Sequence, residues 1–189
     1  MPLSSSADRE PIHTRTVECR GYRRTDGLWD IEGHLTDVKA YPFTNDFRGT
    51  IEPGEPLHDM WLRITVDDSL TITAAEAVTD NGPYHLCGDI TPNFQRLVGL
   101  PIRAGFTRKV REAIGGVHGC THLVELLGPM ATTAFQTVFP ILHRERIERG
   151  EHTPSGRPAL LNSCHAYASD SEIVKRYWPD AYTGDRAAE

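Results

Sequence analysis

The chain has 189 residues, of which 39% are hydrophobic and 24% charged, and its formal net charge is −6. This length can bury a full core as one domain, or as one domain with a tail, and the composition is that of a globular protein. The basic residues are scattered, which excludes the basic surface used to bind nucleic acids or anionic membranes.

Neither a membrane span nor a signal sequence is visible. No apolar run approaches the roughly 18–20 residues of a transmembrane helix, and residues 1–14 lack the apolar stretch of a signal peptide. We therefore expect a cytoplasmic protein whose cysteines stay reduced. No two of these cysteines form a CxxC pair, which excludes a zinc ribbon or a thioredoxin-like centre; they are Cys19, Cys87, Cys120 and Cys164.

The first half of the chain has the alternating pattern of β-strands. Residues 28–41 place Trp29, Ile31 and Leu35 on one face and polar residues on the other. Residues 58–66 and 70–80 flank a DDS turn and predict a hairpin. Parity puts His58 on the apolar face of the first hairpin strand and Glu76 on that of the second. An earlier strand is predicted at 15–24.

The second half has helical periodicity. A cap-like Thr-Pro precedes residues 93–100, and a short helix is predicted over 106–116. The long helix that follows has apolar residues at three- and four-residue spacing, beside a second stripe that includes Glu125 and Thr132. Pro129 is expected to kink or restart this helix.

Strands followed by helices, without βαβ alternation, predict an α+β fold. We expect an N-terminal antiparallel sheet covered on one face by C-terminal helices. The expected organisation is a flexible leader (1–14), a single domain (15–152) and a C-terminal tail (153–189) that docks on the domain or on a partner subunit.

Several stretches together resemble a bacterial family defined as a domain of unknown function. They are DGLWDIEGHLTDVKAY, GEPLHDMWLRITVDD, GGVHGCTHLVELLGPMATTAFQ and NSCHAY, and they span nearly the whole chain. The resemblance supports one family fold but implies no activity.

The order of hairpin, cysteine and cysteine-bearing helix is also similar to iron–sulfur scaffold proteins of the NifU type. MWLRITV, HLCGDI with Cys87 and HGC with Cys120 fall in the same order as the scaffold motifs. The first scaffold cysteine is missing, and His58 lies near its place. The likeness implies that Cys87, Cys120 and His58 converge, where they would bind one zinc or iron ion. The alternative is that both cysteines are small buried hydrophobes.

Two histidine–glutamate pairs are candidates for acid–base catalysis. His58 and Glu76 share the buried side of the predicted hairpin, unless a bulge turns one of them to solvent. His122 and Glu125 are three residues apart on a helix and can share a face. His34 lies near a strand end, on a face that is by default solvated, and is kept as a further catalytic candidate.

The remaining candidates concern substrate binding. Arg63 could hold an anionic group or pair with a surface carboxylate. Tyr84, Trp61 and Thr132 could line a pocket, and the aromatic residues Trp29 and Phe106 suit a phenolic substrate or simply pack in the core. No nucleotide-binding motif is present. The leading hypothesis is a small cytoplasmic lyase or isomerase acting on a small metabolite. It needs either no cofactor or a single metal ion, and it could form a homo-oligomer; the alternative is a metal-binding scaffold or carrier.

Overall fold

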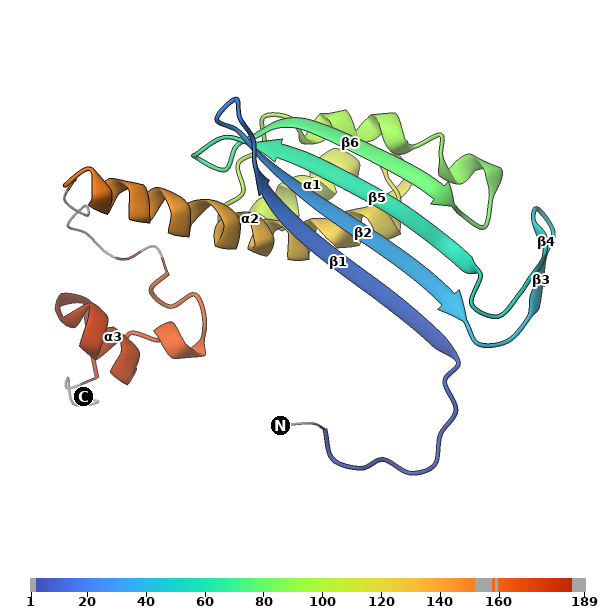
Figure 1. Ribbon diagram of the computed structural model, residues 1–189, viewed down its shortest axis with the longest axis horizontal. Coiled ribbons are helices and arrows are strands. Elements are labelled where there is room, and N and C mark those ends of the chain that lie inside the picture. Colours follow the sequence, from blue (N-terminus) through green and yellow to red (C-terminus); the bar gives the residue numbers. More distant parts are fainter. Residues whose placement is uncertain (1–2, 152–157, 159, 185–189) are drawn as a thin grey trace. The chain divides into compact units, whose positions relative to one another are not determined.

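The computed structural model describes residues 3–151, 158 and 160–184. Four strands form an antiparallel sheet in the order β1-β2-β5-β6 (Figure 1). They are β1 (His13–Arg23), β2 (Trp29–Lys39), β5 (Pro56–Val66) and β6 (Ile72–Asn81). A small hairpin of β3 (Phe43–Asn45) and β4 (Gly49–Ile51) lies between β2 and β5 in the sequence.

The helices follow the sheet in the sequence, as predicted. They are α1 (Phe106–Ile114), α2 (Thr121–Glu148) and α3 (Glu172–Tyr177), with 3-10 turns η1 (His85–Cys87), η2 (Thr91–Leu97), η3 (Gly116–His118), η4 (His165–Tyr167) and η5 (Pro179–Ala181). Figure 1 shows α1 and α2 on one face of the sheet. The predicted α+β class is confirmed.

Alternation along β2 and β5 builds the core between the sheet and these helices. Ile31 and Leu35 of β2, together with Met60 and Ile64 of β5, are fully buried on the inner face. Helix α2 approaches the sheet closely above Gly33, where a Cβ atom would lie 2.7 Å from the sulfur of Met130. The first turn of α2 lies over the end of the sheet where β2 ends and β5 begins.

Helix α2 is continuous through Pro129 and Pro140, so the prediction that Pro129 restarts the helix is wrong. Each proline removes the hydrogen bond to the carbonyl four residues earlier, on Glu125 and Gln136 respectively. Glu125, Gln136 and both prolines are exposed, so water can take the place of the missing donors.

The chain divides into two compact units, Met1–Arg144 and Glu145–Glu189. In the second unit, Val174 of α3 is buried and the hydroxyl of Ser171 caps the helix by accepting from the amide of Val174. Tyr167 packs against Trp178, with ring centroids 5.3 Å apart. The expected docking of residues 153–189 stays a prediction, and residues 152–157, 159 and 185–189 lie outside the described residues. Among the described helices, none has the length and apolarity to cross a membrane.

Candidate active site

A row of polar side chains crosses the inner face of the sheet at one end. The register sets Arg15 of β1 opposite Asp37 of β2, and Asp37 opposite His58 of β5. Directly opposed residues of antiparallel strands point to the same face, so these three side chains meet. Asp37 is 1% exposed and His58 is 8% exposed, although both are polar.

Asp37 is the centre of this row, and both of its carboxylate oxygens are occupied. Oδ1 accepts hydrogen bonds from His13 Nε2 at 3.0 Å and from Arg15 Nε at 2.8 Å. Oδ2 accepts from an Nη atom of Arg15 at 2.7 Å and from His58 Nδ1 at 2.9 Å. Four donors fill the roughly four lone-pair positions of a carboxylate.

The first turn of α2 completes the site from above. The ring of His122 lies against that of His58, with centroids 3.8 Å apart and an interplanar angle of 32°. His122 Nε2 is 3.9 Å from Asp37 Oδ2, and the Cys120 sulfur is 4.0 Å from His122 Nδ1. The side chain of His122 is 26% exposed, so it forms the open side of the cluster.

The charge states of the cluster follow from burial and from Arg15. Burial acts to raise the pKa of Asp37, but the hydrogen bonds and charge of Arg15, together with His58 and His13, lower it to about 2. Burial lowers the pKa of His58 and the neighbouring His122 lowers it further, against the opposing effect of Asp37. Burial and the charge of Arg15 also lower the pKa of His122. Near neutral pH the site therefore holds one carboxylate and two neutral imidazoles.

These charge states fix the proton on His58. An ionised carboxylate can only accept hydrogen bonds, so the Nδ1 atom that contacts Asp37 must carry the proton. The Nε2 atom then holds a free lone pair. A buried carboxylate that holds an imidazole in one tautomer is the arrangement that prepares a histidine to act as a general base.

The same side chains also fit one metal ion. Within the described residues, Asp37, His58 and His122 are the only three histidine, cysteine or acidic side chains whose ligand atoms all lie within 4.8 Å of one another. Tetrahedral zinc bonds of about 2.0–2.2 Å place ligand atoms roughly 3.3–3.6 Å apart. The observed separations from Asp37 Oδ2, 2.9 Å to His58 and 3.9 Å to His122, lie on either side of that value. The positive charge of the Arg15 guanidinium beside Asp37 disfavours binding of a metal cation there.

Glu76 lies on the opposite face of the sheet from His58, so the expected His58–Glu76 pair does not form. The register between β5 and β6 shifts at Thr65/Val66, where Ala74 and Ile72 oppose consecutive residues. The extra residue turns Ala75 inward and Glu76 outward. Glu76 pairs there with Arg63, which also approaches Glu32 at 3.6 Å.

His34 and Trp61 also lie on this outer face. Their rings stack with centroids 3.7 Å apart, and His34 Nε2 bonds to Asp59 Oδ1 at 2.7 Å. The side chains of both His34 and Asp59 are 24% exposed. His34, Trp61 and Arg63 therefore do not reach the Asp37 cluster.

The other predicted helix pair is separated by an arginine. Glu125 accepts a hydrogen bond from Arg15 at 2.6 Å, and its charge acts to raise the pKa of His122. Glu125 thus borders the cluster through Arg15, without a direct hydrogen bond to His122 among the described contacts. Thr132 lies farther along α2, where it is exposed and its hydroxyl donates to the Gly128 carbonyl at 3.5 Å.

The predicted ligand set of Cys87, Cys120 and His58 does not form a cluster among the described residues. Cys120 borders the site, next to His122 and the sulfur of Met60. Cys87 lies in η1, where a Cβ atom on Gly82 would come within 2.8 Å of its Cβ. The likeness to NifU-type proteins stays a prediction.

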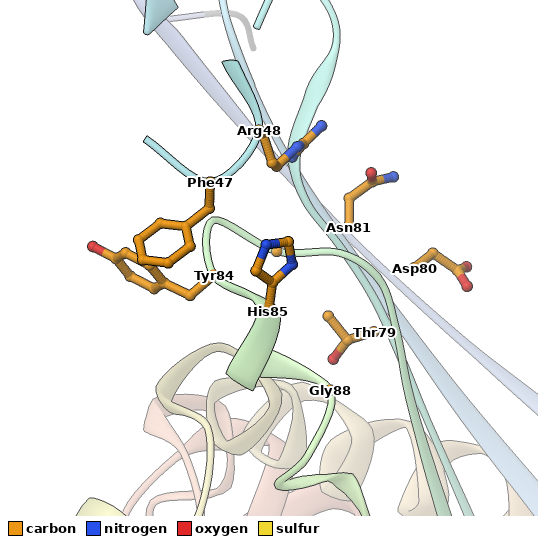
Figure 2. Close-up of a pocket in the computed structure, with 9 residues that line it drawn as sticks. Phe47, Arg48, Thr79, Asp80, Asn81, Tyr84, His85 and Gly88 are labelled. Atoms are coloured by element: carbon orange, nitrogen blue, oxygen red, sulfur yellow. The ribbon is translucent and has the colours of Figure 1, made fainter. Parts of the chain in front are cut away.

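Tyr84 lines a separate open pocket of about 260 Å³ at the end of β6. Figure 2 shows the rings of Phe47 and Tyr84 side by side, with His85 between them and Thr79. Phe47 meets Tyr84 edge-on at 5.3 Å and His85 at 5.6 Å. Neither Asp37 nor His58 lines this pocket.

Three residues of the cluster were not candidates from the sequence: His13, Arg15 and Asp37. Asp37 did carry a signal, because it continues the odd-numbered, buried positions of its strand. His13 and Arg15 carried none, since β1 is exposed along almost its whole length and shows no apolar face.

The fold and the site together define an α+β protein with a buried histidine–aspartate cluster between the sheet and the long helix. The family model described as "Protein of unknown function (DUF2889)" matches residues 13–136, and the chain belongs to this family. The match runs from the start of β1 into α2 and includes every residue of the cluster. No curated protein matches the chain, and no solved structure matches it.

Proposed function

We propose that the protein is an enzyme that performs acid–base chemistry at the Asp37–His58–His122 cluster. The observation that carries this proposal is the saturated carboxylate of Asp37, which fixes the proton on His58 Nδ1. A neutral imidazole that is oriented by a buried carboxylate is suited to taking up a proton and returning it as an imidazolium, and the second imidazole can hydrogen-bond to the substrate beside it.

Each member of the cluster has a distinct part in the proposed reaction. His58 accepts a substrate proton at Nε2, and Asp37 stabilises the imidazolium that results. His122, on the open side, hydrogen-bonds to the substrate, and the His58 imidazolium returns its proton to another position of the substrate or to the leaving group. Arg15 and His13 touch Asp37 only and are positioning residues, because they keep the carboxylate ionised and in place.

The proposed reaction class is a lyase or an isomerase. Such reactions need a base and an acid close together, and the chain has no nucleotide-binding motif to suggest a nucleotide cofactor. The proposed substrate is a small cytoplasmic metabolite. The aromatic cluster of Phe47, Tyr84 and His85 lies at the same end of the sheet and supports a substrate with an aromatic or phenolic ring.

The test combines a spectroscopic arm with a kinetic arm. Nitrogen-15 shifts of the histidine rings should show His58 as the neutral Nδ1–H tautomer at pH 7. For turnover, a panel of single-ring hydroxy and carbonyl compounds is incubated in D2O and followed by proton NMR for deuterium uptake or new products. His58→Gln should lower the rate by at least about 100-fold, since general-base catalysis contributes roughly 10²–10⁴.

The matched control is His34→Gln, because His34 also bonds to an aspartate but lies on the outer face. It should leave the rate within about twofold of the wild-type value, as expected of a surface position. The proposal fails if His58→Gln and His122→Gln both turn over substrate at the wild-type rate, or if His58 is the Nε2–H tautomer.

A second candidate function, favoured by the spacing of the same three side chains, is a metal centre. Two imidazoles and a carboxylate suit zinc or iron(II) and leave coordination positions open. A bound ion would supply Lewis acidity, by lowering the pKa of a water or polarising a carbonyl. Elemental analysis of untagged, anaerobically purified protein tests it. About one ion per chain, lost in His122→Ala and retained in Cys87→Ala, supports this candidate, and no ion after incubation with zinc or iron excludes it.

A further inference from the structure

Strand β1 has a long free edge. All eleven of its residues, His13–Arg23, pair with β2 in one unbroken register. Within the described residues, no other strand pairs with its outer edge, and β1 stands at the border of the sheet in Figure 1. The backbone N–H and C=O groups along this edge are therefore available to another strand.

Natural edge strands are protected against such pairing by shortness, by a proline, by a bulge or by charged side chains. β1 is long and has neither a proline nor a bulge, but it does carry charged side chains. Two of these charges, on Glu18 and Arg20, have opposite signs and favour pairing with another strand. Glu18 and Arg20 lie two residues apart on the outer face, and their side chains form an ion pair at 2.8 Å. Both are about half exposed, at 48% and 57%.

We infer that β1 pairs with β1 of a second copy of this chain, antiparallel, across a twofold axis at Cys19. In this register Glu18 of each copy lies directly opposite Arg20 of the other. Opposite charges at directly opposed positions attract across strands, and here they join the two existing ion pairs into a network of four charges.

The charges select this register over its neighbours. In a twofold pairing that keeps the inner faces of both copies on the same side, one residue of β1 lies on the axis and faces its own copy. Moving the axis from Cys19 by one residue places Glu18 opposite Glu18 in one direction and Arg20 opposite Arg20 in the other. Like charges directly opposed are destabilising, so both alternatives are disfavoured.

Among the remaining pairs of this register, one is unfavourable because it sets two arginines opposite each other. Val17 falls opposite Gly21, and Thr16 falls opposite Tyr22. Arg15 falls opposite Arg23 of the second copy. The charge of Arg15 is offset by Asp37 and Glu125, and the guanidinium of Arg23 lies 5.3 Å from the ring of Trp29.

The pairing bears on the candidate active site, because β1 carries two of the donors to Asp37. His13 and Arg15 project from β1, whose outer edge pairs with no other strand of the described chain. Pairing along that edge holds the strand on both sides and orders the two donors.

The test is a charge swap in the full-length protein, read by sedimentation velocity over a dilution series. The wild-type protein is expected to be a dimer. Glu18→Arg and Arg20→Glu each place like charges across the axis and should weaken dimerisation at least about tenfold. The double variant Glu18→Arg/Arg20→Glu restores opposite charges and should return the dissociation constant to within about threefold of the wild-type value.

Glu76→Arg is the matched control, because Glu76 is an exposed outer-face carboxylate that pairs with an arginine away from β1. It should leave the dissociation constant unchanged, and circular dichroism checks that all variants are folded. A wild-type protein that is monomeric at every concentration overturns the inference. A dimer whose dissociation constant is unchanged by both single charge reversals also overturns it, because the interface must then lie elsewhere. A double variant that does not regain the wild-type dissociation constant overturns it as well.

Discussion

His58 donates from Nδ1 to Asp37 Oδ2 over 2.9 Å, beneath the first turn of α2. His34 lies three positions before Asp37 on β2, and Asp59 lies one position after His58 on β5. These two residues form a hydrogen bond of similar length on the outer face. The two pairs differ in their surroundings, because the inner pair is buried beside Arg15 whereas the outer pair is open to water. Burial lowers the pKa of His58, and Arg15 lowers that of Asp37 against the effect of burial; these surroundings distinguish the inner pair as the candidate site.

The buried pair should matter for stability far more than the outer pair. Asp37→Asn removes the charge that Arg15 and His58 surround, and it leaves the guanidinium with the exposed Glu125 as its carboxylate partner. Breaking a buried charge pair costs about 3 kcal/mol. We expect a loss of that size in the free energy of unfolding, measured by urea denaturation. Asp59→Asn is the control and should cost about 0.5 kcal/mol or less; equal losses in the two variants would contradict the prediction.

The two inner histidines should make the protein less stable as the pH falls from 7 to 5. Their pKa values in the folded state are lowered below the ordinary histidine value of 6.5 by burial, so the unfolded chain binds more protons in this range. Stability is then full above the unfolded pKa and falls as the pH drops below it. His58→Gln and His122→Gln should each flatten the slope of unfolding free energy against pH. A wild-type slope that persists in both variants would refute this explanation.

The sequence predicted the inner face of β2 and β5 because apolar residues alternate there without interruption. His58 was placed correctly by the same parity. Glu76 was placed on the wrong face because the bulge in β6 falls within a run whose Ala74 and Ala75 fit either face, so alternation carries no signal there.

The cluster itself could not be predicted from periodicity. It depends on which residue of one strand lies opposite which residue of the next, and Arg15, Asp37 and His58 are 22 and 21 positions apart in turn. Alternation gives the face of each side chain but leaves the register open. His122 was identified as a candidate because a polar residue opens an otherwise apolar helix, but its contact with His58 depends on how α2 crosses the sheet.

Arg15 should control the ionisation of Asp37. In the wild-type protein the pKa of Asp37 is lowered to about 2, against the effect of burial. Arg15→Gln removes the positive charge and leaves the effect of burial dominant, so the pKa of Asp37 should rise above the ordinary aspartate value of 3.8. Carbon-13 NMR titration of the carboxyl carbon measures it. Arg63→Gln, on the outer face, should leave this pKa unchanged. A value that stays near 2 in Arg15→Gln would show that the histidines hold the carboxylate ionised without the arginine.

The close approach of α2 to β1 should be sensitive to a single methyl group at Gly21. A Cβ atom at this position would overlap Oγ1 of Thr137 and lie 2.7 Å from its Cγ2 and 2.8 Å from its Cβ. Thr137 is held in place because its hydroxyl donates to the Thr133 carbonyl at 2.8 Å. Gly21→Ala should therefore destabilise the protein by about 1–3 kcal/mol, as overpacking does.

The control for this substitution is Gly88→Ala, because Gly88 has φ −75° and open space around its Cβ position. Its cost should stay within about 0.5 kcal/mol. In the double variant Gly21→Ala/Thr137→Ala the overlapping atoms are largely removed, so the loss should be smaller than the sum of the two single losses. Urea unfolding of all four variants measures this coupling. Additive losses would mean that α2 shifts away from β1 to accommodate the methyl group, and His122 would then also move relative to His58.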